Sequence, residues 1–283
     1  MTNRVHYHHP DDEQYSLTYV TGDRESIVDS DGEGIIERHM FDEEFYVLYT
    51  NSGASGVIKE EPAAIDEEVI AQLSSDDRVI TLRYLRLFKE VVKKKEREEG
   101  KPLRMYKERD DDEIPDAINR VDWGSVATDV AGELMSSLIL KHPLPNANHR
   151  TAISMAGWYL KSTQSGFSLP TLATEDYNWK GWVDEYIVRS KKILTVRRNT
   201  TAFEMLQEWG CESIVRKGGI EIDLSEYELG IPTSDAYRRY AKEHTNLCIE
   251  FMIESVNRAG YDELSRLEGP TKSQFAAFLQ QRE

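Results

Sequence analysis

Residues 142–150 read His-Pro-Leu-Pro-Asn-Ala-Asn-His-Arg and join two segments of helical hydrophobic periodicity. The first segment follows Ser125, a residue type that caps helices, and has apolar residues at Val126, Val130, Leu134 and Leu138. Pro143 and Pro145 must end that helix, because proline lacks the backbone donor that a helix interior needs. Periodicity resumes after Asn148, with apolar residues at Ile153, Ala156 and Leu160. The sequence therefore predicts a helix, a proline-containing loop and a second helix.

The loop combines residue types that suit phosphate. The backbone N–H groups and the positive dipole end at the start of the second helix attract anions. Arg150, in the first turn, carries a planar cation that donates two parallel hydrogen bonds to phosphate oxygens. His142, at the end of the first helix, is placed to act as a base on a hydroxyl beside that phosphate. This pattern indicates phosphate chemistry at the loop.

The same stretch resembles the signature of the Fic/Doc family. That signature reads histidine, any residue, phenylalanine, any residue, an acidic residue, glycine or alanine, asparagine, glycine or lysine, arginine. The resemblance implies that His142 is the general base, that Asn148 orients the loop and the phosphates, and that Arg150 neutralises phosphate charge. It adds Asn146, Ala147 and His149 to the phosphate- and nucleotide-binding residues. Ala147, with Thr151 and Ala152 after Arg150, is closer to the Doc branch than to the glycine-rich adenylylating branch.

The resemblance implies a transferase that moves a phosphate-containing group, phosphate or AMP, from a nucleoside triphosphate to a hydroxyl of a target protein. ATP is the expected donor, and an inhibitory partner protein, as in toxin–antitoxin pairs, would control the activity. Two other interpretations of the loop stay open. It can bind a nucleotide or phosphate without catalysis, or it can be a plain connection in which His142 caps the preceding helix.

The sequence departs from the family signature at three positions of the motif, and Asn146 is the largest departure. Asn146 stands where the family carries the carboxylate that holds magnesium against the nucleotide phosphates, so the sequence assigns no metal ligand. Leu144 replaces phenylalanine and His149 replaces glycine or lysine. Beyond the motif, Ile153 stands where adenylylating members carry a second arginine. These differences point away from standard AMP transfer.

Composition limits the partners and the compartment. The 283 residues include 51 acidic and 35 basic ones, for a formal net charge of −16, which disfavours nucleic-acid binding. The two cysteines, Cys211 and Cys248, are too far apart for a Cys-x-x-Cys motif, which fits a reducing compartment. Residues 1–19 lack the apolar core of a signal peptide, and no stretch is long and apolar enough to span a bilayer. The sequence predicts a soluble, cytoplasmic protein, without naming its target or oligomeric state.

For the whole chain we expect a mainly α protein, a Fic/Doc-like helical bundle with a small β-containing N-terminal arm and extra C-terminal helices. The expected segments are the arm at 1–60, the helical core at 61–210 and the helical extension at 211–283. Strands are predicted at 15–20, 45–50 and 220–224, and a turn-rich stretch at 29–34. Further helices are predicted at 174–194, from Thr201, at 234–257 and at 271–281, and a loop at 101–121.

Four other clusters were considered as sites, and a structural explanation is favoured for each. A polar tail is favoured over a transition-metal site at His6, His8 and His9. A solvated surface is favoured for Lys93–Lys95 and for Asp110–Glu113. The aromatic residues that follow the loop suit either a base-stacking platform or the core, and the core is favoured. They are Trp158, Tyr159, Trp179, Trp182 and Tyr186, of which Tyr159 is the one chosen for mutation.

Overall fold

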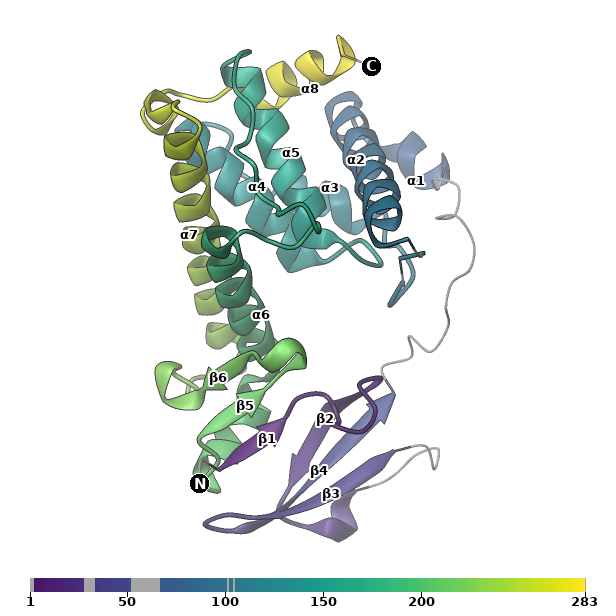
Figure 1. Ribbon diagram of the computed structural model, residues 1–283, viewed down its shortest axis with the longest axis vertical. Helices are drawn as coiled ribbons and strands as arrows, with labels where there is room; N and C mark the ends of the chain where they lie inside the picture. The colour runs from purple at the N-terminus through teal and green to yellow at the C-terminus, as the bar shows by residue number, and fades with distance from the viewer. Residues whose placement is uncertain (1–2, 28–33, 52–66, 101, 104, 283) are drawn as a thin grey trace. The chain divides into compact units, whose positions relative to one another are not determined.

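A computed structural model of the chain describes residues 3–27, 34–51, 67–100, 102–103 and 105–282 (Figure 1). Its contacts divide the chain into two compact units. The first is Met1–Gly56 with Val188–Lys242, and the second is Val57–Ile187 with Glu243–Glu283. Each unit thus combines two separate stretches of chain, whereas the sequence predicts three consecutive segments.

The first unit contains an antiparallel sheet of order β2-β4-β3. Its strands are β2 (Tyr15–Thr21), β4 (Glu44–Asn51) and β3 (Ile35–Met40). In the central strand Phe45, Val47 and Tyr49 are completely buried, and their spacing of two puts all three on one face. The strands predicted at 15–20 and 45–50 are confirmed, and β3 was not predicted. The predicted turn-rich stretch lies outside the described residues except for its last residue.

A second sheet in the first unit has the order β1-β5-β6. Its strands are β1 (Arg4–His6), β5 (Ser213–Val215) and β6 (Glu221–Asp223). β1 pairs in parallel with β5, so that Val5 lies opposite Ile214, and both side chains are completely buried. The predicted strand at 220–224 corresponds to β6.

The expectation of a mainly α, Fic/Doc-like helical bundle is therefore wrong, because the described chain is a mixed α/β protein with two small sheets. Strands are not confined to the N-terminal arm, since β5 and β6 belong to the segment that was expected to be a helical extension. A strand of three residues shows too little alternation to be recognised locally. The pairing of Arg4 with Ser213 is also invisible to any short window of sequence.

The chain passes from one unit to the other within two long helices. They are α6 (Gly181–Glu208) and α7 (Thr233–Arg258). α7 confirms the helix predicted at 234–257. α6 replaces the two helices predicted from 174 and from Thr201, and the expected break is only a kink, where Asn199 has φ −128° and ψ 21°. The residues from 174 to 180 are not helical.

The second unit holds the remaining helices of the described chain. They are α1 (Glu67–Gln72), α2 (Ser75–Glu99), α3 (Glu113–Ile118), α4 (Ala127–Lys141), α5 (Asn148–Thr163) and α8 (Lys272–Gln280). α4 and α5 pack together and bury Leu134, Leu138, Ile153 and Leu160. α3 lies inside the segment predicted to be a loop. Among the described residues, no helix has the length and apolar character that crossing a membrane would require.

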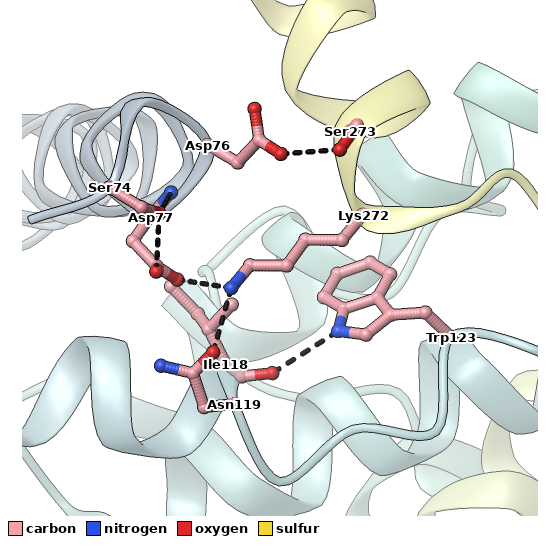
Figure 2. A network of polar contacts seen from close by, with 8 residues as sticks. All are labelled: Ser74, Asp76, Asp77, Ile118, Asn119, Trp123, Lys272 and Ser273. Atoms are coloured by element: carbon pink, nitrogen blue, oxygen red, sulfur yellow. Dashed lines mark hydrogen bonds and ion pairs between the residues drawn. The ribbon is translucent and has the colours of Figure 1, made fainter.

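Lys272, the first residue of α8, connects that helix to α2 and α3 (Figure 2). Its ammonium nitrogen lies 2.5 Å from Oδ1 of Asp77 and donates a 2.7 Å hydrogen bond to Oδ1 of Asn119. Ser74, the N-cap of α2, donates to the other oxygen of Asp77 and accepts a hydrogen bond from its backbone N–H. These contacts fix the start of α8 against the ends of two other helices of the unit.

α4 and α7 approach each other closely at Gly132. A Cβ atom at Gly132 would lie 2.6 Å from the backbone of Ile249, which cannot move as a side chain can. We therefore expect Gly132→Ala to lower the free energy of unfolding by about 1–3 kcal/mol, the usual cost of overpacking. Chemical denaturation measures this loss. Gly181→Ala is the matched control, because its Cβ would meet nothing within 4 Å. Equal stability of the two variants would contradict the close approach.

Candidate functional site

The loop between α4 and α5 begins and ends with a residue in the left-handed conformation. His142, the C-cap of α4, has φ 51°, and its backbone N–H donates to the carbonyl of Leu138. Ala147, the N-cap of α5, has φ 57°. Residues other than glycine rarely adopt a positive φ, and those that do cluster at functional sites. In the described part of the chain only His142, Ala147 and Tyr177 do so.

Asn148 closes the loop through its side chain. Its Oδ1 accepts a 3.1 Å hydrogen bond from the backbone N–H of Leu144, and its Nδ2 donates a 2.9 Å hydrogen bond to the carbonyl of the same residue. Asn148 is 4% exposed and Leu144 is completely buried. The buried side chain of Leu144 thus fixes the loop in the core. The side chain of Asn148, in the first turn of α5, binds the backbone of Leu144.

The residues before α3 line one side of the loop with backbone contacts. The backbone N–H of Tyr106 donates to the carbonyl of Pro145, and that of Asp110 donates to the carbonyl of Pro143. Asp111 is buried and forms a two-point ion pair with Arg109, at 2.5 and 2.8 Å. The acidic run expected to be a solvated surface therefore includes one buried carboxylate that orders the segment beside the loop.

Asn146 turns its side chain onto the loop itself. Its Oδ1 accepts a hydrogen bond from the backbone N–H of Ala147, at 2.5 Å. The oxygen at the position expected for a metal carboxylate is therefore already used by the backbone. His149 is half-buried in the first turn of α5. Within the residues that the structure describes, no group of three or more His, Cys, Asp and Glu side chains is arranged to hold a metal ion.

Arg150 contacts two aromatic rings. The central carbon of its guanidinium is 4.1 Å from the centre of the Tyr177 ring and 3.8 Å from that of Trp179. Its Nη2 donates a 2.7 Å hydrogen bond to the carbonyl of Tyr177. Burial raises the pKa of the Tyr177 hydroxyl, and the neighbouring Arg150 acts in the opposite direction. Contacts between a cation and aromatic rings are attractive, so they hold the Arg150 guanidinium in this position.

A pocket of about 560 Å³ lies beside Arg150. It is formed by one side of α2, by α5 and by the segment 170–179, all in the second unit. Its lining residues are Leu87, Glu90, Val91, Lys94, Glu98, Arg150, Ile153, Ser154, Pro170, Thr171, Leu172, Ala173, Thr174, Glu175, Tyr177 and Trp179. Of the residues predicted at the loop, Arg150 is the one that lines this pocket.

Tyr177, Trp179 and Lys94 belong to the site but were not predicted from the sequence. Tyr177 and Trp179 were assigned to a helix, but they lie in a short extended segment where Trp179 forms an antiparallel bridge with Ala173. The turn-forming residues at 174–178 were the sequence feature that could have shown this. Tyr159, the aromatic residue chosen for mutation, is completely buried and donates to the carbonyl of Pro270.

The N-terminal histidines have partners in the first unit. The Nδ1 atom of His8 lies 3.0 Å from the hydroxyl of Ser16. The Nε2 atom of His9 lies 3.1 Å from a carboxylate oxygen of Glu37. Burial, followed by the charges of Lys217 and Arg216, lowers the pKa of His8 to about 4. His8 and His9 are therefore parts of the folded unit.

A family model described as "Family of unknown function (DUF8172)" matches residues 1–283. No curated protein and no solved structure matches the chain.

Proposed function

We propose for this chain, which belongs to the DUF8172 family, a Fic/Doc-type transfer at the loop 142–150. In this proposal the loop binds a nucleoside triphosphate, ATP being the expected donor. A phosphate-containing group, phosphate or AMP, then moves to a hydroxyl of a target protein. The observation that carries the proposal is the loop conformation. Left-handed backbone at His142 and Ala147, bridged by the buried side chain of Asn148, shapes a strained loop that leads into the positive end of α5.

The chemistry assigns one role to each side chain. His142 accepts the proton of the target hydroxyl as the hydroxyl oxygen forms its bond to phosphorus. The bond from that phosphorus to the leaving oxygen breaks, and a nucleoside diphosphate or pyrophosphate departs with the electron pair. The first turn of α5 and the guanidinium of Arg150 stabilise the negative charge that spreads over the phosphate oxygens. His149, in the same turn, adds positive charge when a neighbouring phosphate favours its protonated form.

Transfer of label tests the proposal directly. Purified protein is incubated with ATP labelled on the α- or the γ-phosphate and with a cell extract that contains candidate target proteins. We expect label from one of the two positions to appear on protein in a way that depends on His142, and its position identifies the group that moves. Binding of ATP without any transfer of label from either position would contradict the proposal.

A second candidate function is a nucleotide-binding module without catalysis. The observation that favours it is Asn146, whose neutral amide replaces the expected carboxylate and already accepts the N–H of Ala147. Magnesium prefers anionic oxygen ligands and would be held mainly by the nucleotide phosphates here. If this second function is correct, calorimetry detects binding of ATP to the protein, and labelled ATP leaves no label on protein.

Asn146→Asp should create magnesium dependence. The aspartate oxygen can accept the same hydrogen bond from Ala147, so the loop conformation is kept while one negative charge is added. We expect magnesium to tighten ATP binding by this variant about tenfold, because one or two carboxylates and the phosphates are its usual ligands. Calorimetry with magnesium and with a chelator measures the effect, and Asn146→Ser is the uncharged control. If the Asp variant shows no more magnesium dependence than the Ser variant, Asn146 is not at a metal position.

A further inference from the structure

The pocket beside Arg150 has the size and composition of a small-molecule site. Its volume of about 560 Å³ lies within the usual range for ligand pockets, which are mostly apolar with a few polar groups. The apolar part of the lining comes from all three walls. It includes Leu87 and Val91 of α2, Ile153 of α5, and Pro170 and Leu172 of the extended segment. These apolar residues, with the aromatic rings of Tyr177 and Trp179 in the same lining, suit a weakly polar ring system.

Two cations of the pocket lining lie beside the ring of Tyr177. The guanidinium carbon of Arg150 lies 4.1 Å from the centre of the Tyr177 ring, and the ammonium nitrogen of Lys94 lies 5.2 Å from the same centre. Two cations therefore converge on one aromatic side chain of the lining. This side of the pocket suits an anionic group of the ligand, and Arg150 can bind such a group at two points.

Negative charge is placed along α2. Glu90 and Glu98 lie four residues before and four after Lys94, so the three side chains share one face of the helix, and all three line the pocket. Carboxylates accept hydrogen bonds and donate none at neutral pH. They suit a ligand that carries hydroxyl or amino groups. The combination of a flat ring, donor groups and an attached anion describes a nucleotide.

We infer that this pocket binds the nucleoside part of the donor, with the attached phosphate at Arg150. The inference rests on the function proposed for the loop and adds to it the place where the nucleoside binds. Arg150 belongs to both places, because it lines the pocket and stands in the first turn of α5 directly after the loop. A nucleoside in the pocket with its phosphate at Arg150 therefore has that phosphate at a residue of the first turn of α5.

The test compares ATP with inorganic tripolyphosphate, which has the phosphates without the nucleoside. Ser154→Phe fills the pocket from α5. The half-buried Ser154 donates to the carbonyl of Arg150 within its own helix, so its replacement removes one local hydrogen bond. Ser162→Phe is the matched control. Ser162 is also half-buried on α5 and also donates to a carbonyl of its own helix, that of Tyr159.

Calorimetry gives the affinities, and thermal unfolding checks that each variant is folded. We expect wild-type protein to bind ATP at least tenfold more tightly than tripolyphosphate, and Ser162→Phe to behave in the same way. Ser154→Phe should lose that preference while its affinity for tripolyphosphate is unchanged. If Ser154→Phe does not fold, Leu172→Trp narrows the same pocket from the extended segment and is subject to the same expectation.

The unfavourable outcomes separate the two proposals. If folded pocket-filling variants keep the wild-type preference for ATP, the nucleoside does not occupy this pocket, and the inference is overturned while the loop function stands. Equal affinity of the wild type for ATP and tripolyphosphate would likewise overturn the inference and leave the loop function standing. If wild-type protein binds neither probe, the loop does not bind phosphate, and both the proposed function and the inference fail.

Discussion

His142→Asn is expected to slow label transfer from ATP at least about 100-fold, the usual contribution of a general base, and to leave ATP affinity unchanged. Asparagine is the suitable replacement because His142 has φ 51°, and asparagine tolerates the left-handed conformation better than alanine does. The variant therefore removes the imidazole and keeps the turn at the end of α4. Its effect on transfer reports the loss of a proton acceptor.

Initial rates of label transfer and the melting temperature are measured for the same preparations. His8→Asn is the control, because His8 is a half-buried imidazole in the first unit that contacts Ser16. Its transfer rate should stay near that of the wild type. Transfer by His142→Asn at the wild-type rate would exclude His142 as the base and would contradict the proposed transfer at this loop.

Asn148→Ala is expected to lower the free energy of unfolding by about 2–4 kcal/mol, because it removes two hydrogen bonds and leaves buried backbone groups of Leu144 without them. The same variant should lose most of its ATP affinity, since the loop is no longer held at the start of α5. Asn148→Asp keeps the acceptor for the N–H of Leu144 but loses the donor to its carbonyl, so an effect on ATP affinity of intermediate size is expected.

Urea denaturation and calorimetry measure the two effects of Asn148→Ala. Asn257→Ala, at an exposed position near the end of α7, serves as the control and should change neither quantity appreciably. A stable Asn148→Ala protein that binds ATP normally would show that the side-chain bridge to Leu144 does not maintain the phosphate-binding loop.

Local sequence patterns predicted the helices around the loop well. Apolar spacing and the two prolines located α4 and α5, although α4 begins at Ala127 after Val126, whose side chain makes no capping hydrogen bond. Ser125, the expected cap, lies 3.3 Å from a carboxylate oxygen of Asp122 instead. A capping serine is predicted from its residue type alone. In the folded protein a nearby acceptor can take the hydrogen bond of its hydroxyl instead.

The surroundings of Arg150 could not be predicted in the same way. Its aromatic neighbours, Tyr177 and Trp179, follow it by 27 residues or more, and periodic spacing assigned them to a helix. The positive φ of Tyr177, 60°, and the bridge between Ala173 and Trp179 show an extended turn there. The turn-forming residues at 174–178 are a local signal for this turn, but its contacts with Arg150 of α5 and Lys94 of α2 are contained in no local pattern. The pocket and Lys94 were missed for this reason.

The parallel pairing of β1 with β5 affects how the protein is made. β1 comprises residues 4–6 and its partner comprises residues 213–215, so about 210 residues are synthesised between the two strands. At a synthesis rate of about 5–20 residues per second, the first strand waits roughly 10–40 s for the strand beside it. During that time Val5, which ends completely buried, has no sheet to join. A nascent chain of this protein thus exposes Val5 until β5 has been synthesised, which makes the segment around β1 a natural point of contact for chaperones.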